Sequence, residues 1–364
     1  MLQHEPGELL EGASILDEFR DRVGMVLWQS LRDVTLWAET PVEARDGLFT
    51  EEAGRRRLED LLTSGAEPTL EISLSTLAAL VSTPATAAPE IISLVCLQVS
   101  EWADLRGAMA TAVAYAQAAA VAFPEDPDPA LAAGTVLLRW KRHARAETWL
   151  RRCIGLARRA GEWTNYAEAY QHLGRLFESR GDHAGAERYY VKAIRAARRH
   201  GLYHVRGAAL HGLMRLRMEA GALVDAERLG RAAVRASRQG NVRTGALMHD
   251  LAYVWVKSGE FAKAIPVLKR ALPARLDPQE RALTLSILAH AGAETGDQHL
   301  YRESWMDAWT LVTTAEAAKR RGEHAQTFVE LMRASVIMRD WAHVEQVARY
   351  AGLPSPRPAG GQGG

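Results

Sequence analysis

The chain has 364 residues, 48% of them hydrophobic, which is enough for a sizeable core. Its only two cysteines, Cys96 and Cys153, exclude a disulfide framework. Because they form no CxxC pair, they also argue against a zinc site, and two lone thiols suit a reducing cytoplasm. The net charge of +1 hides a split, since residues 1–140 hold nine lysines and arginines against 22 acidic residues, and residues 141–243 hold 22 against nine. The split suggests attraction between the two parts or an acidic partner for the basic part, or it reflects arginine as a good helix former.

Helix is favoured nearly everywhere, because alanine, leucine and arginine dominate while valine and isoleucine are sparse. The opening residues MLQHEPGELLEG lack the basic region and apolar stretch of a secretory signal. The alanine-rich run at 109–123 is too short to span a bilayer. We therefore expect a helical, cytoplasmic protein without a membrane span.

The first elements in chain order are three predicted helical segments. Residues 12–40 are typical of one long or broken amphipathic helix, Thr50 can cap the start of a second helix, and residues 67–82 form a third. We interpret 1–88 as an acidic N-terminal helical region that covers the open end of the following part. The alternative is a separate docking or autoinhibitory module whose acidity complements the basic residues downstream.

A set of large and small residues then recurs at intervals of about 40 residues. The clearest copy consists of Leu173, Gly174, Phe177, Gly181, Ala186, Tyr190 and Ala193. Copies with Leu213 and Leu251 follow 40 and then a further 38 residues later, and weaker ones lie on either side. Spacings of three and four give each helix one apolar stripe. Gly181 can end the first helix of a pair, and Asp182 can cap the second.

This pattern resembles the tetratricopeptide repeat family over roughly residues 90–350. Several units have 37–40 residues instead of the family's 34, which resembles the sensor arms of large bacterial transcription activators and kinesin light chain. The resemblance implies an all-α, right-handed α-solenoid of about six helix pairs preceded by an N-terminal helical cap. The repeat array would occupy residues 89–350, and residues 351–364 would be a disordered tail.

The clearest copy also concentrates polar side chains that could form a metal or acid/base site. They are His172, Glu178, Asp182, His183 and Glu187. No HExxH motif occurs and no ExxH pair recurs in a second helix, so a structural role is favoured, in which His183 packs between helices. The nucleotide-binding patterns GxxxxGK[ST] and GxGxxG are absent too. We expect no catalytic residue, no metal and no cofactor, and both cysteines in the core.

In the tetratricopeptide family the first helix of each pair lines a concave groove, which implies a set of partner-binding residues here. They are Gln171, Arg175, Glu178, His211, Arg215, His249, Tyr253, Lys257 and His290. The same positions also include Glu168, Glu219, Ser286 and Glu294. The cations and histidines in this row suit a peptide that carries acidic groups. We predict a non-catalytic adaptor or regulator that binds a protein or peptide. The alternative is a free-standing sensor arm for a peptide or small ligand.

Arginines recur in the later turns of the second helices. They are Arg151, Arg152, Arg158, Arg159, Arg195, Arg198, Arg199, Arg231, Arg235 and Arg238. Most of them are explained by the helix dipole, which favours cations at helix C-termini. They could instead contact phosphates, but aromatic residues do not alternate with them in the sequence. Nucleic acid therefore stays open as a partner with little support from the sequence.

Overall fold

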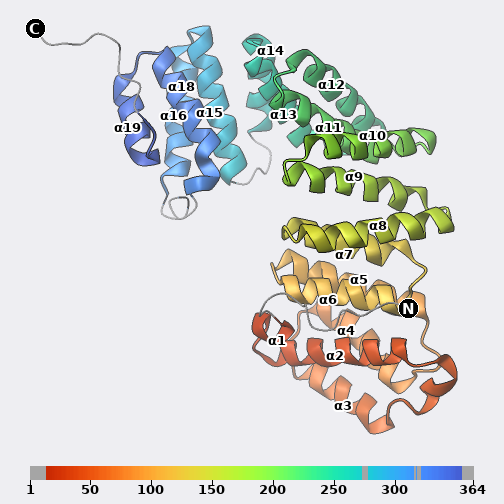
Figure 1. Cartoon of the computed structure of the whole chain (residues 1–364). Helices are drawn as coiled ribbons and strands as arrows, with labels where there is room; N and C mark the ends of the chain where they lie inside the picture. Colours follow the sequence, from red (N-terminus) through yellow and green to blue (C-terminus); the bar gives the residue numbers. More distant parts are fainter. Residues whose placement is uncertain (1–13, 273–277, 315–316, 318–320, 355–364) are drawn as a thin grey trace, which may run out of the picture. The chain divides into compact units, whose positions relative to one another are not determined.

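A computed structural model describes residues 14–272, 278–314, 317 and 321–354. All elements of this part are helices and it contains no strand, so the predicted all-α class is confirmed (Figure 1). The elements are α1 (Ile15–Glu18), α2 (Arg22–Glu39), η1 (Val42–Gly47), α3 (Glu51–Leu62), α4 (Pro68–Ser82), α5 (Pro89–Leu105), α6 (Met109–Ala122), α7 (Pro127–Arg139), α8 (His143–Ala160), α9 (Trp163–Ser179), α10 (His183–Arg199), α11 (Tyr203–Glu219), α12 (Leu223–Gln239), α13 (Gly245–Lys257), α14 (Phe261–Ala271), α15 (Pro278–Thr295), α16 (Gln298–Val312), η2 (Arg321–His324), α18 (Ala325–Ile337) and α19 (Trp341–Ala351).

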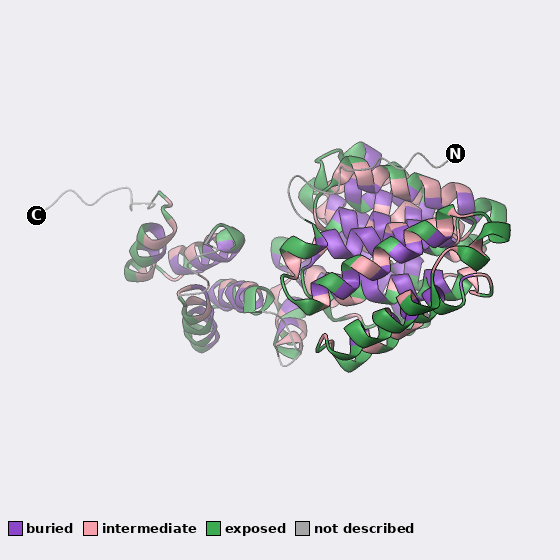
Figure 2. Cartoon of the chain, turned by 90° about the horizontal axis from the view of Figure 1, so that it is seen from below, coloured by how far each residue is buried: buried purple, intermediate pink, exposed green. Residues whose placement is uncertain are grey.

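The chain divides into two compact units, unit 1 at residues 1–205 and unit 2 at residues 206–364. Within each unit successive helices pack against one another, and the buried residues lie on the sides where helices meet (Figure 2). The domain boundaries proposed at residues 88 and 350 stay predictions, and most of the predicted tail lies outside the described residues. No helix of the described part is long and apolar enough to cross a membrane.

In unit 1 the N-terminal helices contact α6, and the last side chain of α1 caps the start of α6. The predicted helix at 12–40 is broken into α1 and α2, with residues 12 and 13 outside the described part. The carboxylate of Glu18 accepts hydrogen bonds from the backbone N–H groups of Ala110 (2.7 Å) and Thr111 (2.9 Å). It thereby satisfies donors at the start of α6 that have no partner within the helix. Thr50 caps α3 as predicted, accepting from the N–H of Ala53.

The pair α9 and α10 shows why the repeat needs its small residues. A Cβ atom on Gly174 would lie 2.5 Å from Cδ1 of the buried Tyr190 ring, so only glycine lets the two helices approach this closely. Gly181 follows α9 with φ +76°, a conformation that costs glycine little. Asp182 caps α10 as predicted, because its Oδ1 accepts from the N–H of Gly185 at 2.8 Å.

The prediction that His183 packs between helices is wrong. Asp182 is the N-cap, so His183 becomes the first residue of α10, where its side chain is exposed. The aromatic contact between the two helices comes instead from Phe177 and Tyr189, whose ring centroids lie 4.9 Å apart. The position after the turn therefore belongs to the helix end and not to the core.

The two thiols lie in the core of unit 1, as predicted. Cys96 and Cys153 are free and fully buried. Burial raises the pKa of the Cys153 thiol to about 12 and raises that of Cys96 as well. Because the thiolate is the nucleophilic form, these side chains behave as small apolar residues.

Unit 2 repeats the helix pair with more divergent residues. Asp297 and Asp340 cap α16 and α19 in the way that Asp182 caps α10. Arg339 stands where the clearest copy has Gly181, and it takes a positive φ of 54° without being glycine. The last copy, which is degenerate in the sequence, therefore still forms the pair α18 and α19.

Candidate functional site

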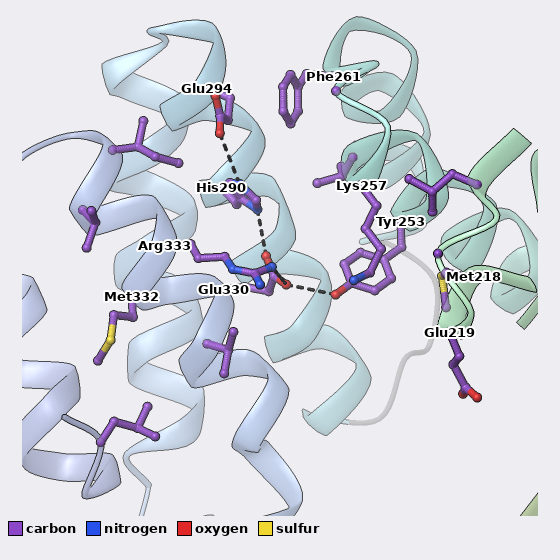
Figure 3. Close-up of a pocket in the computed structure, with 18 of the residues that line it drawn as sticks. Met218, Glu219, Tyr253, Lys257, Phe261, His290, Glu294, Glu330, Met332 and Arg333 are labelled. Atoms are coloured by element: carbon purple, nitrogen blue, oxygen red, sulfur yellow. Dashed lines mark hydrogen bonds and ion pairs between the residues drawn. The ribbon is translucent and has the colours of Figure 1, made fainter. Parts of the chain in front are cut away.

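A groove of about 1070 Å³ lies within unit 2. Residues of α11, α12, α13 and α14 line one side and residues of α15 and α18 line the other (Figure 3). Its walls are mainly apolar and include Met218, Leu223, Val256, Phe261, Val329, Met332, Val336 and Ile337. Its charged side chains are Glu219, Lys257, Glu294, Glu330 and Arg333.

A buried carboxylate organises the polar part of this groove. The side chain of Glu330 on α18 is fully buried. Its Oε2 accepts from Nδ1 of His290 at 2.7 Å, and its Oε1 accepts from the hydroxyl of Tyr253 at 2.9 Å. The amide of Gln326 donates to the same Oε1 at 2.8 Å, and Arg333 approaches it at 3.4 Å. Side chains from three first helices, α13, α15 and α18, thus meet at one carboxylate.

The charges of this network follow from its hydrogen bonds. Burial alone would raise the pKa of Glu330, but the hydrogen bond and charge of His290, with the donors Tyr253 and Arg333, outweigh it and lower the pKa. Burial and the nearby Glu330 carboxylate raise the pKa of Tyr253, so its hydroxyl keeps the proton that it donates. Nδ1 of His290 faces the Glu330 carboxylate, and its Nε2 lies 3.6 Å from Oε1 of Glu294, so both ring nitrogens face carboxylate oxygens.

The arrangement can hold a ligand more readily than it can perform acid/base chemistry. The oxygens of Glu330 already accept from several donors, so this carboxylate orients its neighbours instead of taking a proton from a ligand. Lys257 lies with its ammonium 5.0 Å from the centroid of the Tyr253 ring. Among the described residues, no group of histidine, cysteine and acidic side chains is placed to hold a metal ion.

A second network of the same kind joins α11 and α13. Nε2 of His211 lies 2.7 Å from Oδ2 of Asp250, and Nδ1 of His249 lies 3.2 Å from Oδ1. Burial alone would raise the pKa of Asp250, but hydrogen bonds and charge from the two histidines bring it well below its ordinary value. Asp250 directly precedes Leu251, and Glu330 directly precedes Leu331, so both carboxylates occupy the same position of the repeat.

The structure distributes the predicted groove residues of unit 2 over three environments. Tyr253, Lys257 and His290 line the groove together, with Glu219 and Glu294 from the same predicted positions. His211 and His249 belong to the Asp250 network, and Arg215 is half-buried on α11. Ser286 does not fit the prediction, because it is fully buried and its hydroxyl donates to the carbonyl of Leu283.

In unit 1 the predicted groove residues lie on α9. Gln171 is half-buried and Arg175 is exposed. Glu178 accepts a hydrogen bond from the hydroxyl of Tyr190 on α10, which ties this carboxylate to the helix pair. A partner-binding role for these three side chains stays a prediction.

His172, from the polar segment of the clearest copy, is not part of an acid/base site. Burial, together with the charges of Arg175 and Arg139, lowers the pKa of His172 to about 4. Its Nδ1 has no hydrogen-bond partner among the described residues. The imidazole is therefore neutral at ordinary pH and serves as packing.

Sequence reasoning missed the side chains that α18 contributes to the groove. Glu330, Met332, Arg333 and Val336 lie in the degenerate last copy, where no frame positions could be transferred. A signal did exist in the spacing of histidines and acids. His211 precedes Asp250 by 39 residues and His290 precedes Glu330 by 40, both close to the repeat interval of about 40 residues.

Comparison with known proteins agrees with the repeat. The family model described as tetratricopeptide repeat matches residues 128–199. The matched part spans α7 to α10 and is similar to tetratricopeptide repeats, in agreement with the resemblance that the sequence pattern shows. No curated protein matches the sequence.

Three solved structures share the fold. PilF of Pseudomonas aeruginosa is 14% identical with a TM-score of 0.51, covering 65% of this chain and 99% of that one. The apo form of RapI is 12% identical with a TM-score of 0.51, covering 71% and 98%. Aspartyl phosphate phosphatase F from Bacillus subtilis is 11% identical with a TM-score of 0.50, covering 92% and 97%. At these identities the likeness concerns the fold alone.

Proposed function

We propose that the chain is a non-catalytic adaptor or regulator that binds a protein segment or peptide in the groove of unit 2. One observation carries this proposal: the groove combines long apolar walls with a polar network whose members are held by one another. Apolar walls with a few fixed polar groups are what ligand sites generally present, because the walls supply affinity and the polar groups supply orientation.

The two cations of the groove support the predicted preference for acidic groups. Lys257 comes from α13 and Arg333 from α18, on opposite sides of the groove (Figure 3). Both can donate charge-assisted hydrogen bonds to a carboxylate or to backbone carbonyls of a bound segment. Glu219 and Glu294 also line the groove, so an acid of the ligand would have to lie between the two cations.

The alternative function, a sensor arm that binds a small ligand, is favoured by the size of the groove. A volume of about 1070 Å³ is near the upper end of ordinary small-molecule pockets, which run from roughly 300 to 1,000 Å³. The cytoplasmic location belongs to the same proposal, and the two buried free thiols support it.

Selection of peptides on the full-length protein tests this function. Peptides of roughly 12 residues, enough to fill such a groove, would be selected from a random phage-displayed library and measured by fluorescence anisotropy. Ile337→Asp places a carboxylate in the apolar wall, and we expect it to weaken the selected peptides about tenfold or more, because burying an unpaired charge costs well over 1.4 kcal/mol.

The matched control is Ile72→Asp on α4 of unit 1, where the side chain is 69% exposed and lies outside the groove. We expect this variant to bind the selected peptides as the wild type does. Equal loss in both variants, or a selection that enriches no peptide, contradicts the proposed function. Enrichment of peptides whose binding ignores Arg333→Gln and Lys257→Gln contradicts the acidic preference only.

A further inference from the structure

Aromatic side chains of α9 and α10 form a connected strip in unit 1. The ring centroids of Trp163 and Tyr166 lie 5.7 Å apart, and those of Tyr166 and Tyr170 lie 4.9 Å apart. Tyr170 then stacks on Tyr189 at 6.2 Å. Trp163 is 37% exposed and the three tyrosines are half-buried, so the strip reaches the surface along its length.

Cations from the two neighbouring second helices flank this strip. The ammonium of Lys192 on α10 lies 5.5 Å from the ring centroid of Tyr170 and 5.1 Å from that of Tyr189. Interaction with the hydroxyl of the neighbouring Tyr189 raises the pKa of Arg151 on α8. Arg158 follows Arg151 by seven residues, so it lies about two turns further along the same face of α8.

The charge around the strip is strongly positive. Residues 141–205 hold 14 lysines and arginines against six acidic residues. Lys192 and Arg158 are exposed, and the side chain of Arg151 is 59% exposed although it also pairs with Glu147. Such a surface attracts a polyanion, and its field falls off with salt.

We propose that the aromatic strip, with Arg151, Arg158 and Lys192, binds single-stranded nucleic acid. The cations suit the phosphates, and the rings offer surfaces on which unpaired bases stack, which is how single strands are held without a base-specific code. From Trp163 to Tyr170 the strip runs about 10 Å along α9 at ~1.5 Å per residue, comparable to platforms that stack two or three bases. The bases of a duplex are already stacked on one another, so a duplex would offer its phosphates to the cations but no free bases to the rings.

The sequence alone indicated only the arginines of this surface and not its rings. Tyr189 follows Arg188 directly in α10, but the other three rings come from α9, the first helix of the pair. Folding places α9 against both α8 and α10, so rings and cations separated along the chain become neighbours. The strip shares no residue with the groove of unit 2, and the two proposals stand independently.

The proposal is tested by fluorescence anisotropy on the full-length protein at about 50 mM salt. The probe is a labelled single-stranded RNA of mixed sequence and about 12 nucleotides. We expect saturable binding that weakens with added salt, and about tenfold weaker binding of an abasic strand of equal length. Tyr189→Leu keeps an apolar side chain and should weaken the RNA about tenfold. Arg158→Gln with Lys192→Gln should weaken it at least as much and lower the salt dependence.

The matched control is Arg235→Gln with Arg238→Gln, which removes two exposed arginines from α12 in unit 2. We expect this variant to bind the RNA within about twofold of the wild type, because charges outside the strip are screened by salt and contribute little to binding. The proposal is overturned if the RNA does not bind at low salt, if the abasic strand or a duplex binds as well, or if the control weakens binding equally. Circular dichroism checks that each variant folds. If Tyr189→Leu does not fold, the variant Arg158→Gln with Lys192→Gln decides the question.

Discussion

Unit 1 and unit 2 use the same repeat, yet they treat the residue before the frame leucine in different ways. In α9 of unit 1 this residue is His172, which is neutral and serves as packing. In α13 and α18 of unit 2 it is Asp250 and Glu330, and each carboxylate is held by a histidine from the preceding first helix. The apolar frame gives both units their helix pairs, while the acids at this position in α13 and α18 join neighbouring pairs through a polar network. The groove lies where the Glu330 network forms.

The largest expected effect comes from removing the carboxylate of Glu330 in unit 2. We expect Glu330→Ala to lower the free energy of unfolding of unit 2 by about 3–5 kcal/mol, because Tyr253 and His290 lose their buried acceptor. Urea unfolding of the full-length protein measures the change. Glu330→Gln, which keeps an acceptor oxygen, should cost about 1–3 kcal/mol, and equal losses for the two variants would show that the carboxylate has no special role.

The next effect concerns His172 in unit 1 and depends on pH. Its pKa is about 4 in the folded protein against an ordinary 6.5, so the unfolded chain takes up a proton first as the pH falls. Unit 1 should therefore lose stability between pH 6.5 and 4, by up to about 3 kcal/mol, with nothing lost above that window. His172→Leu should flatten this slope. Parallel stability curves for wild type and variant between pH 4 and pH 7 would contradict the assignment.

A smaller loss is expected where the helices of unit 1 touch. Gly174→Ala should cost about 1–3 kcal/mol, because the added Cβ meets the Tyr190 ring and the helices must separate. Gly245→Ala in α13 of unit 2 is the control, since nothing lies within 4 Å of the added atom. Thermal unfolding followed by circular dichroism should show a loss for the first variant and little change for the second. A neutral Gly174→Ala would mean that the pair tolerates a wider spacing.

The smallest effect tests what the units share. Asp182→Ala in unit 1 and Asp297→Ala in unit 2 each remove a side-chain cap, so each should cost about 1 kcal/mol. Urea unfolding of the two variants is sensitive enough to compare them. Clearly unequal losses would indicate that the caps are supported differently in the two units.

The sequence predicted the helix pairs well and the site only in part. Leu173, Gly181 and Asp182 do locally what their spacing predicts, because stripes, turns and caps depend on neighbours along the chain. Glu330 could not be found in this way, because its partners lie on other helices and become close only when repeats stack. Tyr253 and His290 were predicted from their frame positions alone, without the carboxylate that joins them.

Amide hydrogen exchange on the full-length protein, with and without a selected peptide, tests the central claim most directly. The proposed function predicts slower exchange in fragments from α13 and α18, whose side chains line the groove, and unchanged exchange in α9 and α10 of unit 1. Protection confined to unit 1, or bound peptide without protection of α13 and α18, would contradict the groove of unit 2 as the binding site.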